Sequence, residues 1–128
     1  MNGGWSLLAK AYPSSQPFDG QLWSFQSGQL GVRDELDPSL EALEHYRSCL
    51  NISANREGIH LSIFLLFRLW HPPLFMPWDD VGISPAEGVF FKKMRFDFRC
   101  VPLVSLYIRE GLGREVIRYA EWYSPSAT

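Results

Sequence analysis

Residues 46–67 read YRSCLNISANREGIHLSIFLLF and carry the clearest structural pattern in the chain. In the first part, apolar Leu50, Ile52 and Ala54 alternate with polar neighbours, which is typical of a strand with one buried face. The second part has an unbroken apolar face made by Ile59, Leu61, Ile63, Leu65 and Phe67. The linking residues 55–58 end in glycine, as many hairpin loops do. The pattern predicts two antiparallel strands, residues 46–54 and 59–67.

The end of the second strand is apolar on both sides. On its other face His60 and Ser62 give way to Phe64 and Leu66. A strand that is apolar on both faces needs a cover on each of them. We expect that cover to be another element of the fold, a ligand or another chain.

Weaker patterns place the other elements. We expect helices at residues 5–12 and 114–123, a short helix after Asp37-Pro38, and strands at residues 22–29, 74–78, 89–100 and 103–108. Asp37 can cap a helix, Pro38 is tolerated at its first position, and Leu40 and Leu43 would form its apolar stripe. Asp79-Asp80-Val81 reads as a turn. Pro77 cannot donate to a sheet ladder, so its strand should lie at an edge.

These elements predict one domain of α+β or mostly β class, a small antiparallel sheet or barrel with a helix at each end. The expected parts are residues 1–20 (helix and loop), 21–110 (strand-rich core) and 111–123 (terminal helix) within a single domain, 1–128. A chain of 128 residues with 46% apolar residues has enough material for one core.

Composition narrows the function classes. A net charge of −2 is unusual for a dedicated nucleic-acid domain, so we expect no nucleic-acid partner. Residues 1–12 lack the pattern of a signal peptide, and the longest apolar run is too short to span a bilayer, which favours a cytoplasmic location. The two cysteines, Cys49 and Cys100, lie in apolar stretches and are expected to be buried free thiols. No cofactor is predicted.

Part of the sequence is similar to a group of small uncharacterised bacterial proteins. The similarity rests on residues 58–62 (GIHLS), 67–68 (FR), 71–74 (HPPL) and 77–78 (PW), which follow a pattern of "GLxLS" leading to "FRxxHPPLxxPW". The chain departs from that pattern at Leu69-Trp70, where a smaller residue is expected before the histidine. The group resembles a bacterial version of the pleckstrin-homology (PH) or GRAM superfold. The resemblance implies a PH-like barrel plugged by a C-terminal helix, and a broad binding role without shared catalytic residues.

The aromatic side chains near the Pro-rich turn form the first candidate site for a ligand or partner. The set comprises Phe64, Leu66, Trp70, His71, Phe75 and Trp78. Aromatic surface of this kind is typical of protein interfaces. The alternative is a covered core, with His71 a structural histidine that bonds a nearby carbonyl.

A second candidate is a basic patch. Lys93, Arg95 and Arg99 share the polar face of one predicted strand and could bind phosphate headgroups or acidic peptides, although Asp97 interrupts them. The alternative is an ordinary solvated face.

Signals for chemistry are weak elsewhere. Asp79 and Asp80 are adjacent, so on a strand they would point to opposite faces. His45 and Cys49 lie four apart, which pairs residues on a helix but not on a strand. No spacing of His and Cys matches a metal site, and no catalytic residue is assigned.

Three functions remain open. The first is an interaction module that contacts a protein partner or another copy of itself through the aromatic loop. The second is a peripheral lipid or membrane-surface binder that uses the basic patch. The third is a small-molecule-binding protein or an enzyme of unknown class. This hypothesis rests on the observation that small α+β folds often enclose a pocket. The absence of a catalytic motif makes an enzyme the less favoured reading.

Overall fold

The computed structural model describes residues 3–14, 19–63, 71–87 and 92–120. In chain order the elements are α1 (Gly4–Ala11), β1 (Gln21–Arg33), β2 (Glu41–Ala54), β3 (Gly58–Ile63), β4 (Leu74–Pro77), the 3-10 turn η2 (Trp78–Asp80), β5 (Val81–Glu87), β6 (Lys92–Phe98), β7 (Val101–Arg109) and α2 (Glu110–Ile117). The fold is therefore mostly β with a short helix near each end, as the sequence predicts.

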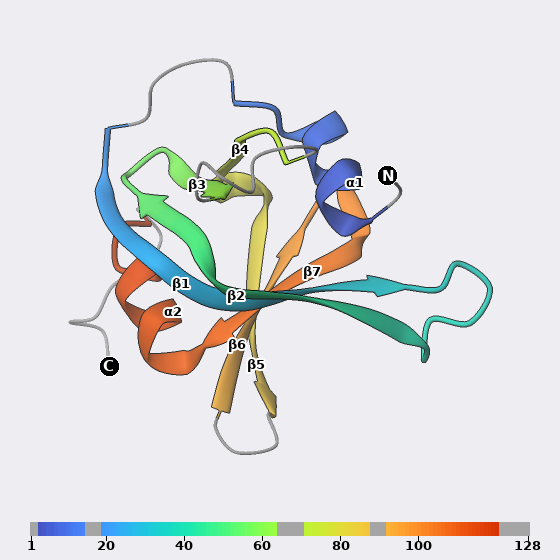
Figure 1. The fold of residues 1–128 in the computed structure, drawn as a ribbon. Helices are drawn as coiled ribbons and strands as arrows, with labels where there is room; N and C mark the ends of the chain where they lie inside the picture. Colours follow the sequence, from blue (N-terminus) through green and yellow to red (C-terminus); the bar gives the residue numbers. More distant parts are fainter. Residues whose placement is uncertain (1–2, 15–18, 64–70, 88–91, 121–128) are drawn as a thin grey trace.

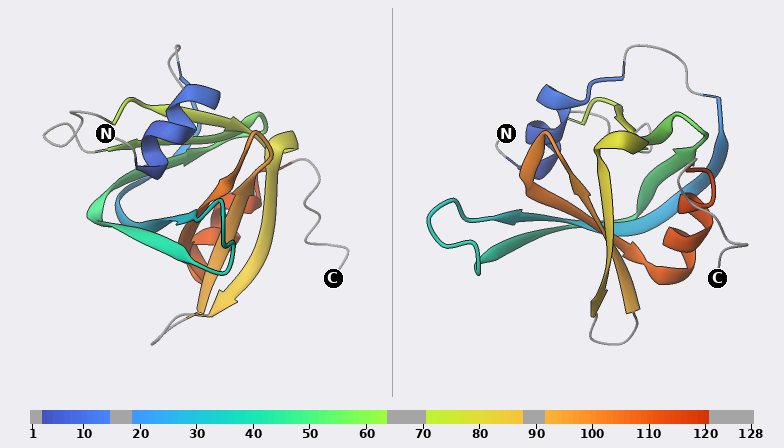
Figure 2. Two further views of the ribbon diagram at one scale, coloured as in Figure 1. Left: turned by 90° about the vertical axis from the view of Figure 1, so that its right-hand side faces the viewer. Right: turned by 180° about the vertical axis from the view of Figure 1, so that it is seen from behind.

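All seven of these strands belong to one antiparallel sheet with the order β4-β3-β2-β1-β7-β6-β5. The sheet curls into a half-barrel, and α1 and α2 lie at opposite corners of it (Figures 1 and 2). Strand β1 pairs with β2 along most of its length but with β7 only from Gln29 to Val32. This short overlap lets the two halves of the sheet splay apart.

The central hairpin folds as its alternation predicts. Leu50, Ile52 and Ala54 of β2 are buried, and so are the apolar residues of β3 that face the same side. Asn55 holds the connecting loop, because its Oδ1 accepts the backbone N–H groups of Glu57 (2.7 Å) and Gly58 (3.3 Å). Residues 64–67 of the predicted second strand lie outside the described residues.

The helices close the two ends of the core. In α1, Trp5 and Leu8 are buried, and the Trp5 indole N–H donates to the carbonyl of Pro72 at 2.8 Å. In α2, Leu112 and Val116 are fully buried, and the helix packs on β6 and β7. Each helix is short, so its position depends mainly on this packing.

The predicted helix after Asp37-Pro38 is wrong. Asp37 Oδ1 instead accepts the backbone N–H (3.1 Å) and the hydroxyl (2.6 Å) of Ser39, which makes a turn, and β2 begins at Glu41. Helix caps and Asp turns use the same short-range hydrogen bonds. Pairing with β1, which the local sequence does not reveal, decides between them.

Other predictions from the sequence also differ from the structure. The chain enters strand β5 at Val81, where the sequence suggested a turn; Gly82 and Pro85 weaken its strand signal, and Pro85 is tolerated because β5 ends the sheet. Helix α2 ends at Ile117, and residues 121–123 of the predicted helix lie outside the described residues. Cys100, expected to be buried, is exposed because β6 ends at Phe98.

The edge prediction for Pro77 is confirmed, since β4 ends the sheet at the side opposite β5. In the register of β3 with β4, Gly58 faces Pro77. A Cβ atom on Gly58 would lie 2.2 Å from the carbonyl oxygen of Met76, so this close approach requires glycine.

Candidate functional site: a cationic groove

A groove with a volume of about 1100 Å³ lies beside the middle of the β1–β2 ladder. Four backbone segments line it: residues 25–29 of β1, 45–48 of β2, 92–93 of β6, and 107–111 at the junction of β7 and α2. The groove therefore combines parts of the chain that are far apart in sequence. We call it the cationic groove for the charges described below.

Irregular backbone shapes one wall of the groove. Between the pairs Trp23–Ile52 and Gln26–Leu50, strand β1 has one residue more than β2; in the next interval β2 has the excess. Phe25 (φ 55°) and Ser48 (φ 53°) adopt the left-handed conformation at these bulges. Bulges bend a strand and re-aim its side chains, and non-glycine residues held in this conformation concentrate at functional sites.

Hydrogen bonds fix both bulges. The backbone N–H of Phe25 donates to Asn51 Oδ1 at 3.3 Å, and that of Ser48 donates to Ser27 Oγ at 2.9 Å. The Phe25 side chain remains 57% exposed at the groove. A large apolar ring is thus held in contact with solvent by a strained backbone.

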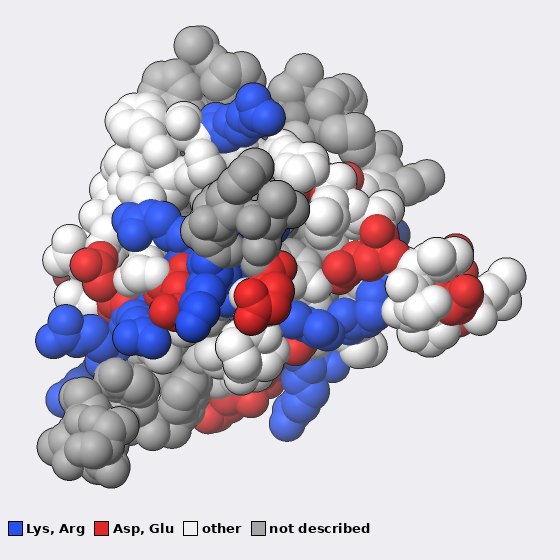
Figure 3. All heavy atoms as spheres, turned by 90° about the horizontal axis from the view of Figure 1, so that it is seen from below, with Lys and Arg blue, Asp and Glu red and all other residues white. Residues whose placement is uncertain are grey.

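Positive charge dominates the lining. Arg47, Lys92, Lys93 and Arg109 line the groove, whereas Glu110 is the one carboxylate among the described lining residues. Glu110 is already paired with Arg114 at 3.1 Å. Figure 3 views the molecule from below and shows Lys and Arg side chains across its centre, with Asp and Glu side chains among them.

No ion pair neutralises the groove cations within the part of the chain that the structure describes. The ion pairs there join Arg95 to Asp97, Arg99 to Asp80, and Arg114 to Glu110. Among the described residues, the groove therefore presents four cations that lie outside any ion pair, in a chain whose net charge is −2. Such a concave site concentrates anions.

A chain of two side-chain hydrogen bonds runs from β6 through β1 to β2 along the wall of the groove. The Lys93 ammonium donates to Gln29 Oε1, and Gln29 Nε2 lies 3.0 Å from His45 Nδ1. Because Lys93 has only protons to offer, the Gln29 oxygen must face it, and the Gln29 amide then donates to His45. Lys93 also lies 5.9 Å from the centroid of the Tyr107 ring.

Tyr107 marks the end of the groove nearest the turn between β1 and β2. Its hydroxyl donates to both carboxylate oxygens of Glu41, at 2.9 and 3.0 Å. Burial, followed by this hydrogen bond and the charge of Glu41, raises the pKa of Tyr107 to about 12. The phenol therefore stays neutral at physiological pH and acts as a donor.

The predicted basic patch is divided by the structure. Lys93 lines the cationic groove, but Arg95 pairs with Asp97 at 2.9 Å and Arg99 with Asp80 at 3.6 Å. Sequence reasoning missed Arg47 and Arg109 as groove residues. They lie on separate strands, and only the curl of the sheet brings them to the groove that Lys93 lines.

The predicted aromatic site is partly visible. The His71 ring lies against those of Trp5 (5.3 Å) and Tyr46 (5.7 Å), and Trp78 is 4% exposed with its indole N–H donating to the Asn55 carbonyl at 2.7 Å. Phe75 is half-buried. Phe64, Leu66 and Trp70 lie outside the described residues. The described members thus pack within the fold, and a binding role for the set stays a prediction.

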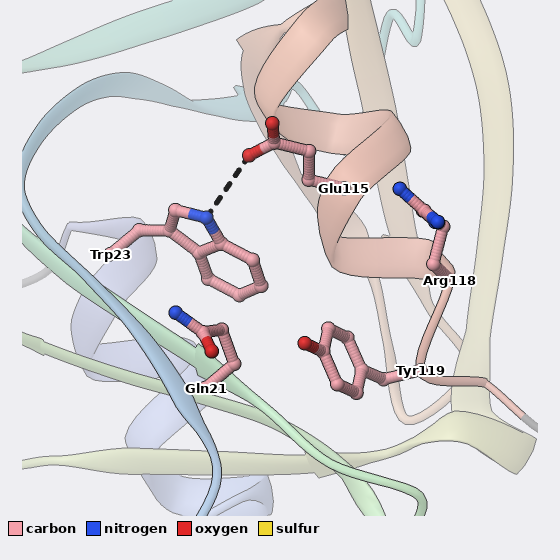
Figure 4. A pocket seen from close by; sticks show the side chains of 5 residues that line it. All are labelled: Gln21, Trp23, Glu115, Arg118 and Tyr119. Atoms are coloured by element: carbon pink, nitrogen blue, oxygen red, sulfur yellow. Dashed lines mark hydrogen bonds between the residues drawn. The ribbon is translucent and has the colours of Figure 1, made fainter.

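A second, smaller hollow of about 440 Å³ lies between β1 and α2 (Figure 4). The Trp23 indole N–H donates to Glu115 Oε2 at 3.1 Å, and its ring meets that of Tyr119 at 72° with centroids 6.0 Å apart. Gln21 and Arg118 complete the lining. These side chains mainly contact one another and attach α2 to the start of β1.

The weaker sequence candidates have structural roles or no partner for catalysis. Asp80 accepts the Tyr12 hydroxyl at 3.1 Å and the Cys100 thiol at 3.4 Å. Burial raises the pKa of the Cys49 thiol, which opposes its use as a nucleophile. Among the described residues, no three His, Cys, Asp or Glu side chains gather as metal ligands would.

Comparisons with known protein families, with curated proteins and with solved structures gave no match. The PH-like resemblance therefore stays an expectation. In the described ranges, neither helix has the length and apolar character needed to cross a membrane.

Proposed function

We propose that the protein is a non-catalytic interaction module whose cationic groove binds an acidic, apolar-containing segment of a protein partner. The observation that carries the proposal is the set of groove cations, Arg47, Lys92, Lys93 and Arg109, that no ion pair neutralises among the described residues. Uncompensated charges in a concave site favour a ligand of opposite sign, and they speed its encounter with the site.

The rest of the lining favours a peptide over a simple inorganic anion. Phe25, Tyr46 and Tyr107 contribute aromatic surface beside the cations, and Gln26 and Gln29 contribute amides. Tyrosine, phenylalanine and arginine are enriched at protein interfaces, where they offer contact area and directed hydrogen bonds together. A peptide with both carboxylates and apolar side chains uses all of these groups.

A membrane surface is the alternative that the same cations raise. It is less favoured because the turn that joins β1 and β2, residues 34–40, carries Asp34, Glu35 and Asp37 and no basic residue. These carboxylates would approach an anionic bilayer together with the groove and be repelled by it.

The direct test uses fluorescein-labelled oligoglutamate as the probe and fluorescence anisotropy as the readout. We expect saturable binding that weakens with added salt, and no binding of oligolysine. Lys92→Glu and Arg109→Glu should each raise the dissociation constant about tenfold, a loss of about 1.4 kcal/mol. Lys10→Glu is the matched control, because Lys10 is exposed on α1 and does not line the groove.

Two results would overturn the proposal. One is equal binding of oligoglutamate by the Lys10→Glu and Lys92→Glu proteins, which would make the attraction a matter of net charge. The other is sedimentation of the protein with phosphatidylserine vesicles, lost in Arg109→Glu, without any binding of oligoglutamate. That result would assign the groove to a membrane surface.

A further inference from the structure

The turn between β1 and β2 forms an arm that projects from the half-barrel (Figures 1 and 2). Pairing of β1 with β7 ends at Val32, and pairing of β2 with β3 begins at Leu50. Beyond Val32 the two strands therefore pair only with each other, as far as Arg33–Glu41. We call residues 33–41 the arm.

The arm has the chemistry of the ligand proposed above. Its tip carries the carboxylates Asp34, Glu35 and Asp37 beside Leu36, which is 96% exposed, and Leu40, which is 58% exposed. Leu36 therefore buries almost none of its side-chain surface within its own chain. Exposed leucines of this kind are typical of a surface that binds elsewhere.

The tip is ordered before any contact is made. Asp34 Oδ1 accepts the backbone N–H groups of Leu36 (2.8 Å) and Asp37 (3.2 Å), and Asp37 binds Ser39. The hydrogen bond from Ser39 lowers the pKa of Asp37, so its carboxylate stays charged. A segment that is already ordered loses little entropy when it binds.

We propose that the arm of one molecule docks in the cationic groove of a second copy of this chain. This inference rests on the proposed function and names its partner. The carboxylates of the arm meet the groove cations, among them Arg47 and Arg109, while Leu36 packs against the exposed ring of Phe25. Charge and apolar character match on both sides.

The tip of the arm cannot reach the groove of its own molecule, although Glu41 at the base of the arm accepts the hydroxyl of Tyr107 at the near end of the groove. The pair Gln29–His45 lines the groove, and the pair Arg33–Glu41 at the base of the arm lies on the same continuous ladder. The two pairs are separated by roughly 13 Å of strand, and the tip lies farther out. The occupant must come from another copy, and reciprocal exchange of arms gives a closed dimer.

The test is sedimentation velocity over a range of protein concentrations. The native chain should self-associate, and Glu35→Lys, Leu36→Ser and Arg109→Glu should each weaken association about tenfold or more. An equimolar mixture of Glu35→Lys and Arg109→Glu should regain association, because the reversed charges then face each other. Lys10→Glu and Leu22→Ser are the matched controls; Leu22 is 52% exposed but lies outside the arm.

A monomer at every concentration would overturn the inference, as would association that both arm variants leave unchanged. The oligoglutamate assay separates this failure from that of the proposed function. If a monomeric native chain still binds oligoglutamate through Arg109, the groove has an acidic partner other than the arm. If neither assay responds to Arg109→Glu, both proposals fail.

Discussion

Phe25 and Ser48 lie on neighbouring strands of one bulged stretch of the β1–β2 ladder, and both are left-handed, with φ angles of 55° and 53°. Within the described ranges, no other residue has a positive φ. Each side chain lines the cationic groove. The strain and the groove therefore coincide, which is why we interpret the bulges as features that shape a binding site.

The strain at Phe25 predicts an unusual order of stabilities. At a position in a regular strand, a protein with glycine is less stable than the same protein with alanine by about 0.5–1 kcal/mol. A left-handed backbone costs an L-residue about 1–2 kcal/mol that glycine does not pay. We therefore expect Phe25→Gly to be more stable than Phe25→Ala by about 1 kcal/mol in urea unfolding. The ordinary order, with alanine more stable, would show that Phe25 is not strained.

Tyr12, at the end of α1, connects this helix to η2 and to the turn between β6 and β7. Its hydroxyl donates to Asp80 Oδ2 at 3.1 Å and accepts the backbone N–H of Cys100 at 3.0 Å. Tyr12→Phe leaves both partners without this hydroxyl and should lower the free energy of unfolding by about 1–3 kcal/mol. The control is Tyr119→Phe, whose exposed ring should tolerate the change within about 0.5 kcal/mol. Equal losses of stability in the two variants would show that the hydrogen bonds of the Tyr12 hydroxyl do not stabilise the fold.

Two glycines provide a matched test of the β3–β4 contact. A Cβ on Gly58 would lie 2.2 Å from the Met76 carbonyl oxygen, whereas one on Gly82 would meet nothing closer than 4.0 Å. Gly58→Ala should cost about 1–3 kcal/mol of stability through displacement of backbone. Gly82→Ala should be neutral or slightly stabilising. Thermal unfolding of both variants measures the difference. If Gly58→Ala leaves the stability unchanged, the close approach of β4 to β3 is contradicted.

Tyr107 should give the protein a distinct alkaline response. Burial and then Glu41 raise its pKa from 10.0 to about 12, so the neutral phenol is favoured in the folded state. The stability this contributes is complete below pH 10.0 and is lost as the pH rises toward 12. In Glu41→Gln, tyrosinate absorbance should show a lower pKa for Tyr107 that still exceeds 10.0, because burial remains.

The variant Tyr107→Phe is needed to assign this titration to Tyr107. In that variant the corresponding step in tyrosinate absorbance should be absent. An unchanged titration curve in Glu41→Gln would contradict the hydrogen bond between Tyr107 and Glu41.

The sequence predicts those elements whose burial has a clear period. Leu50, Ile52 and Ala54 alternate with polar residues, and each is buried in β2 as expected. Where local signals are ambiguous the prediction fails: Asp37-Pro38 begins a turn inside a hairpin because the decisive partner, β1, is distant in sequence. Pairing across the sheet outweighs local propensity at such positions.

The candidate site is less predictable than the fold. Lys93 is visible in sequence as a strand cation, but Arg47 and Arg109 line the same groove only because the sheet curls. The left-handed conformations of Phe25 and Ser48 carry no glycine or asparagine signal that would announce them. Bulges of this kind depend on long-range register, which periodicity in a single strand does not encode.

The measurement that tests the central claim most directly is an amide NMR titration of the labelled protein with oligoglutamate. The account predicts saturable shift changes centred on residues 25–29, 45–48, 92–93 and 107–111, which form the groove. It further predicts that these changes vanish in Arg109→Glu and persist in Lys10→Glu. Shifts centred instead on His71, Phe75 and β4, or no saturable shifts at all, would contradict it.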